Sequence, residues 1–86
     1  MPNPAQPNAA AARGLMRLPK KLRDADPRAK VQSLVRSAKI ADGQAERALR
    51  YSGDVAKARV LRGRRDDALE ACIYLNRLHH LGYPVA

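Results

Sequence analysis

The chain has 86 residues, enough for one small domain, and it carries 17 Lys and Arg against 8 Asp and Glu, a formal net charge of +9. A domain of this size buries only roughly 60–65% of the surface of its unfolded chain, which leaves little material for an enclosed active site. We therefore expect no catalytic activity, and we expect a partner with negative charge.

The hydrophobic residues are numerous but small. Ala supplies 16 of them, and Phe and Trp are absent, so the core is expected to be thin. A thin core favours pairing with a second copy or with another protein. No stretch approaches the roughly 20 apolar residues of a membrane span, and the single Cys72 fits a reducing compartment. A cytoplasmic protein is expected, with membrane association disfavoured.

The N-terminal quarter of the chain divides into two parts by composition. Residues 1–12 contain three Pro and two Asn and no charged side chain, which predicts a disordered arm. Residues 13–25 begin with five basic side chains before the first acid and are expected to form a basic strap. The remaining residues, 26–86, are expected to form a single helical domain.

Helical spacing of apolar residues is the dominant pattern from Asp26 onward, where Asp followed by Pro is typical of a helix start. Gly43 and Gly63 interrupt the pattern, so the chain is expected either to form four helices or to form a long antiparallel hairpin of 27–51 against 54–81. No alternating run predicts a strand. We therefore predict an all-α small helical bundle or helical hairpin, with helices near 27–41, 44–51, 54–61 and 67–81.

Two local motifs bound the last of these helices. Asp67 and Glu70 have the spacing of a capping box, which predicts a helix start near residue 67. Leu81-Gly82, followed by Pro84, predicts the end, because Gly adopts the left-handed conformation at low cost and Pro prevents the helix from continuing.

Positive charge is concentrated in the first half of the chain. Residues 1–41 hold nine Lys and Arg against two Asp, a net +7, whereas residues 42–86 hold eight against six, a net +2. Cations in this arrangement are suited to a phosphate backbone, to which Arg binds with two parallel hydrogen bonds. Together with an Arg-rich loop expected at 62–65, they give the candidate nucleic-acid-binding residues Arg13, Arg17, Lys20, Lys21, Arg23, Arg28, Arg36, Lys39, Arg62, Arg64 and Arg65.

The first functional hypothesis is therefore a non-catalytic protein that binds DNA or structured RNA through its phosphates. Aromatic side chains for stacking on bases are limited to three Tyr, which favours contact led by the backbone. The alternative hypothesis is a small protein-interaction module, an inhibitor or an assembly component, that docks on an acidic protein surface.

One segment resembles a known DNA-binding motif. The run ALRYSGDVAKARVLRG at 48–63, followed by Leu69, resembles the helix-turn-helix of Fis-type regulators, and the resemblance implies a turn that contains Arg64. However, Arg59 and Arg62 stand where that pattern has small or apolar side chains, and acids follow the turn where phosphates would approach. We do not assign the chain to that family.

A metal site is the last candidate from the sequence. Cys72, Asn76 and His79 share one helical face, with His80 beside them. Structural zinc needs four ligands, and the paired ligand spacing that marks such sites is missing. We predict no metal and no cofactor, with Cys72 packed in the core and the histidines near the C-terminal end of a helix.

Overall fold

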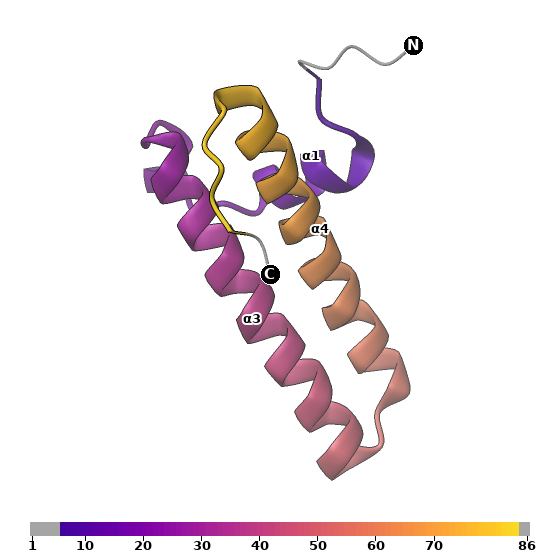
Figure 1. Ribbon diagram of the computed structural model, residues 1–86. Helices are drawn as coiled ribbons and strands as arrows, with labels where there is room; N and C mark the ends of the chain where they lie inside the picture. The colour runs from indigo at the N-terminus through magenta and orange to yellow at the C-terminus, as the bar shows by residue number, and fades with distance from the viewer. Residues whose placement is uncertain (1–5, 85–86) are drawn as a thin grey trace.

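The computed structural model describes residues 6–84, and this part of the chain is all-α, as predicted (Figure 1). The two long helices form an antiparallel hairpin, and α1 packs against the second of them. Residues 1–5 of the predicted arm and 85–86 of the predicted domain lie outside the described residues. The helices are α1 (Ala9–Met16), α2 (Lys20–Arg23), α3 (Pro27–Ser52) and α4 (Val55–His79).

The ends of the hairpin form where the sequence places capping residues. The side chain of Asp26 accepts a hydrogen bond from the backbone N–H of Arg28, so α3 begins as predicted. Gly53 ends α3 in the left-handed region at φ 60°, and Asp54 then accepts from the N–H of Lys57 to begin α4. The turn between α3 and α4 is therefore only two residues long, which fixes the helices as neighbours.

The hairpin core follows a repeat of three and four residues on both helices. Ala at most of these positions lets the two backbones approach closely, and the larger core side chains gather at the end of the hairpin near the N-terminus of α3. This spacing keeps one stripe of each helix facing the other. The buried residues are Val31, Leu34, Ala38, Ala41, Ala45 and Ala48 on α3, and Ala58, Leu61, Ala68, Ala71, Cys72 and Leu75 on α4.

The predicted breaks at Gly43 and Gly63 are wrong, because α3 and α4 each run through their glycine. A helical Gly is less favourable than Ala by about 1 kcal/mol, and burial of the flanking alanines and leucines outweighs this difference. Of the two alternatives from the sequence, the long hairpin is the one observed. The continuous α4 also excludes a turn at Arg64, so the segment that resembles a helix-turn-helix does not fold as one.

The prediction of disorder is wrong for residues 9–12, the last part of the predicted arm. Helix α1 begins at Ala9, where the side chain of Asn8 accepts a hydrogen bond from the N–H of Ala11, so residues 9–12 are helical. Ala11 is buried, and Gly14 lies directly against the backbone of Asp67. Ala11, from a run of alanines that looks uninformative in the sequence, thus forms with Gly14 the small-residue surface by which α1 packs on α4.

Helix α4 ends two residues earlier than the predicted glycine stop. His80 takes the left-handed conformation at φ 52°, and Gly82 is also left-handed but lies in the segment that follows. Asn76 holds this segment: its side-chain amide donates to the carbonyl oxygen of Tyr83 at 2.9 Å and accepts from its N–H at 3.2 Å. The tail therefore turns back and runs along α3 and α4 (Figure 1).

None of the helices within residues 6–84 is both long and apolar enough to cross a membrane.

Candidate nucleic-acid interface

Asp67 of α4 binds two of the arginines that the sequence assigns to a phosphate backbone. Arg13 donates from Nε and Nη2 to the two carboxylate oxygens at 3.2 Å each, and Arg17 donates from Nη1 at 2.7 Å. The Asp67 side chain is only 10% exposed. Its pKa is lowered from the ordinary value, first by the two hydrogen bonds from Arg13 and then by the one from Arg17, against the effect of burial.

The predicted capping box at residue 67 is therefore wrong. Asp67 lies in the middle of α4, twelve residues after its start, and its carboxylate faces α1 instead of a helix end. The ion pairs with Arg13 and Arg17 hold α1 on the hairpin. Because Asp67 neutralises part of the charge of Arg13 and Arg17, the main role of these two arginines is structural.

Arg65 is also engaged by acids. It donates from Nη1 to Asp42 of α3 at 2.6 Å and contacts Asp66 on its own helix at 3.0 Å. These hydrogen bonds, that to Asp42 foremost, raise the pKa of Arg65 above its ordinary value. The contact joins the two long helices across one side of the hairpin.

Most of the other cations have no such partner. The described residues include all 17 Lys and Arg and all 8 Asp and Glu. Ion pairs with side-chain carboxylates engage only four of the cations, namely Arg13, Arg17, Arg65 and Arg50, the last of which pairs with Glu46. Thirteen cations in the described part of the chain are therefore without an ion pair to a side-chain carboxylate.

Five of these unpaired cations lie on one side of the hairpin, which we call the basic hairpin face. Arg36 and Lys39 line a shallow hollow on α3, and Arg59 and Arg62 line another between α3 and α4. Arg28 lies one turn before Gln32 and two turns before Arg36, which both line the hollow on α3. Helical spacing therefore places Arg28 on the same side. All five side chains belong to exposed residues. The basic hairpin face consists of Arg28, Arg36, Lys39, Arg59 and Arg62.

The two hollows lie on the same side because Arg65 connects them. Arg65 lines the hollow with Arg59 and Arg62 and also bonds Asp42, which is one turn beyond Lys39 on α3. Asp67, two residues after Arg65, points about 200° away from it and binds α1. Helix α1 therefore covers the opposite side of the hairpin and leaves the basic hairpin face open.

The acids on the basic hairpin face do not neutralise its five cations. Asp42 and Asp66 both bind Arg65, and Glu46 binds Arg50 at 2.9 Å, one turn along α3. Tyr83, which is not among the predicted site residues, lines the same hollow as Arg36 and Lys39. The chain thus offers an open cationic surface with one tyrosine at its edge.

The structure distributes the predicted site residues over three places. Arg28, Arg36, Lys39 and Arg62 belong to the basic hairpin face. Lys20, Lys21 and Arg23 are exposed on α2, and Pro19 at the start of α2 shares a hollow with Ser37 and Arg64 on the side of α1. Arg13, Arg17 and Arg65 bind carboxylates, as described above. The predicted Arg-rich loop at 62–65 is wrong, since these residues lie inside α4.

Sequence reasoning also misses Arg59 as a member of the site. The sequence feature that could have identified Arg59 is its spacing of three residues from Arg62. This spacing places both side chains on one face only if α4 is continuous. Because Gly63 predicts a break close to this pair, the sequence places Arg59 in a helix at 54–61 and Arg62 in the loop at 62–65. The continuity of α4 is what brings them together.

Cys72 and the histidines do not form a metal site. Cys72 is fully buried beside Val31, whose carbonyl oxygen lies 3.7 Å from its sulfur, and burial raises the pKa of the thiol to about 11. His79 and His80 are exposed at the C-terminal end of α4. Among residues 6–84, no three His, Cys, Asp or Glu side chains are grouped so that they could hold a metal ion.

Comparisons with protein families, with curated proteins and with solved structures find no match to this chain. Its function must therefore be inferred from the geometry of its own residues.

Proposed function

We propose that the protein binds nucleic acid, DNA or structured RNA, by placing the basic hairpin face along the phosphate backbone. The observation that carries this proposal is the open row of Arg28, Arg36, Lys39, Arg59 and Arg62, whose side chains have no carboxylate partner in the described structure. The nearby acids bind other arginines: Asp42 and Asp66 bind Arg65, and Glu46 binds Arg50. The row is therefore free to exchange its counterions for phosphates.

The shape of the row favours a nucleic acid over an acidic protein patch. Arg28 and Lys39 are separated by eleven residues of one straight helix, which is about 16 Å. Arg59 and Arg62 extend the row along α4. Phosphates follow one another regularly along a backbone, so a linear set of cations can meet several of them at once.

The chemistry of the face favours contact with phosphates over recognition of bases. Four of the five cations are arginines, whose planar guanidinium groups can form paired hydrogen bonds with phosphate oxygens. The face contains no protruding recognition helix and no series of aromatic side chains. Binding is therefore proposed to depend on the shape and charge of the nucleic acid more than on its sequence.

The test compares two variants that remove four charges each from the formal net charge of +9. The first, R36Q/K39Q/R59Q/R62Q, removes most of the basic hairpin face. The control removes four exposed cations from elsewhere, as K20Q/K21Q/R23Q/K57Q. Binding is measured by fluorescence anisotropy with a labelled 20-base-pair DNA duplex and with an RNA hairpin, in about 100 mM salt, and folding is checked by circular dichroism.

The first variant is expected to bind roughly 100-fold more weakly or worse, because each lost phosphate contact contributes on the order of 1 kcal/mol. The control is expected to lose less than tenfold. Equal losses of affinity in the two folded variants would show that binding depends on net charge and not on the basic hairpin face. Absence of binding by the unaltered protein would overturn the proposal. In that case, capture of one stoichiometric protein after nuclease treatment would favour the interaction module instead.

A further inference from the structure

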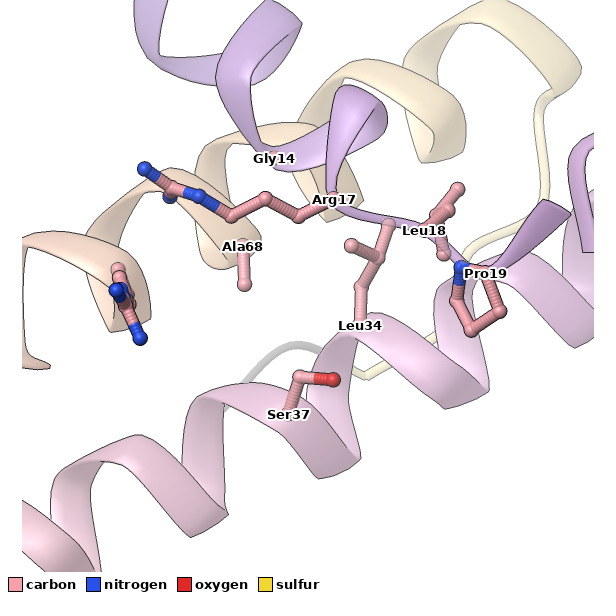
Figure 2. A pocket seen from close by; sticks show the side chains of 8 residues that line it. Gly14, Arg17, Leu18, Pro19, Leu34, Ser37 and Ala68 are labelled. Carbon is pink, nitrogen blue, oxygen red and sulfur yellow. The ribbon is translucent and has the colours of Figure 1, made fainter.

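A second hollow lies on the other side of the hairpin, where the end of α1 meets α3 and α4. Its volume is about 200 Å³, and it is lined by residues from three helices and from the turn after α1. Figure 2 shows Leu18, Leu34 and Pro19 grouped at one end and the side chain of Arg17 reaching toward α4. The hollow is therefore apolar at one end and cationic at the other.

The cationic end is formed by two guanidinium groups. Arg17 is held in place by Asp67, to which its Nη1 donates at 2.7 Å, and its side chain remains 47% exposed. Its other N–H groups have no hydrogen-bond partner in the described structure, although a guanidinium offers five. Arg64 lies one turn before Asp67 on α4, is exposed and has no carboxylate partner there.

The net charge of this end is positive despite the buried acid. Arg17 and Arg64 line it with two positive charges, and the carboxylate that binds Arg17, Asp67, is also bound by Arg13. The hydroxyl group of Ser37 adds a neutral donor from α3, on the wall between the two ends (Figure 2). Donors from α3, from α4 and from the turn after α1 therefore line a single space that has an apolar floor of Leu18, Leu34 and Ala68.

We propose that this hollow binds a small phosphate monoester that carries an apolar group. The guanidinium groups of Arg17 and Arg64 bind the phosphate oxygens, and Leu18, Leu34 and Pro19 contact the apolar group. A phosphate presents three terminal oxygens in different directions, so it can accept from side chains on separate helices, whereas a carboxylate presents two oxygens in one plane. The site is separate from the basic hairpin face and does not depend on its function.

The experiment uses phenyl phosphate as the probe, with inorganic phosphate and phenol as its two halves. Binding is followed by chemical-shift changes in ¹H–¹⁵N spectra of the whole protein. Phenyl phosphate is expected to shift the amides of Gly14, Ser37 and Ala68, and to bind about tenfold more tightly than inorganic phosphate because only it covers the apolar floor.

Two arginine variants on α4 distinguish a site from general attraction. R64A is expected to weaken phenyl phosphate binding about tenfold, because it removes one charged donor from an exposed position with no structural partner. R62A removes the same charge two residues away, on the basic hairpin face, and is expected to change the affinity less than twofold. Conversely, R64A is expected to leave nucleic-acid binding nearly unchanged.

Three results would overturn the proposal. One is equal weakening by R64A and R62A, and another is equal affinity for phenyl phosphate and inorganic phosphate. The third is the absence of shifts around Gly14, Ser37 and Ala68 at millimolar probe. None of these results bears on the basic hairpin face, which is tested with a DNA duplex and with different variants, so the two proposals fail independently.

Discussion

Arg17, which follows directly on α1, donates a hydrogen bond to the buried carboxylate of Asp67 on α4, with 2.7 Å between Nη1 and Oδ2. Together with the paired contact from Arg13, it connects residues that are 50 and 54 positions apart in the chain. The hairpin alone buries mostly alanine. Docking of α1 by these ion pairs therefore adds contacts that a two-helix structure of this composition lacks.

Replacing Asp67 with Asn tests this role. The amide keeps the size of the side chain but removes its charge, so three charge-assisted hydrogen bonds are weakened or lost. We expect the free energy of unfolding in urea to fall by about 2 kcal/mol. D66N, at an exposed carboxylate that pairs with Arg65, serves as the control and should change stability by less than about 1 kcal/mol. Similar values for both would contradict a special role for Asp67.

The lowered pKa of Asp67 predicts a dependence of stability on pH. The unfolded chain binds a proton at this side chain more readily than the folded protein does, whose pKa is below the ordinary 3.8. Its contribution is therefore fully present above the ordinary value and is lost as the pH falls through the lowered folded value. NMR titration should place the Asp67 pKa below 3.8 and should show it rising in R13Q. A titration at or above 3.8 in the unaltered protein would refute the ion-pair assignment.

Gly14 gives a second test of how α1 docks. A Cβ at this position would overlap the backbone carbonyl oxygen of Asp67 and would approach the Ala71 Cβ to 2.9 Å. We expect G14A to lower the free energy of unfolding by about 1–3 kcal/mol because the helices must move apart. G63A is the matched control: nothing lies within 4 Å of its added methyl group, so it should stabilise α4 by about 1 kcal/mol. If G14A were also stabilising, α1 would not pack as described.

The end of α4 offers a stabilising substitution. His80 is the only non-glycine residue with positive φ within the described part of the chain, at 52°. Glycine adopts this conformation without the strain of a Cβ, so H80G should raise the free energy of unfolding by about 1 kcal/mol. H79G, one residue earlier and still helical, should lower it instead. Thermal or urea unfolding of the pair checks the sign, and destabilisation by both would argue against a left-handed cap at residue 80.

The sequence predicts the helical class and the hairpin turn because these depend on local signals. Asp26-Pro27 and Ser52-Gly53-Asp54 satisfy backbone groups within a few residues, and the stripe that includes Val31 and Leu34 follows the helical period. Leu69 of α4 packs against this core but is only partly buried. Leu34→Ala is therefore the more damaging of the two truncations, at about 2–4 kcal/mol, and Leu69→Ala should cost less.

The features that the sequence does not predict all depend on contacts between distant residues. Nothing local distinguishes Asp67 as a buried ion-pair acceptor from Asp67 as a helix cap, because its partner arginines are some fifty residues away. Gly43 and Gly63 have the local character of breaks, and only the packing of α3 on α4 decides against them. The candidate site was therefore predicted as a list of cations, and the structure was needed to separate the open ones from those bound to acids.

The most direct test of the proposed function is the salt dependence of nucleic-acid binding. Each phosphate neutralised on a DNA duplex makes the slope of log K against log salt concentration more negative by about 0.9. Contact by the basic hairpin face therefore predicts a slope of about −4 or steeper for the unaltered protein. R36Q/K39Q/R59Q/R62Q should be shallower by roughly 3–4. The control K20Q/K21Q/R23Q/K57Q should retain the original slope. Parallel lines for the unaltered protein and the first variant would show that these four cations do not touch phosphates.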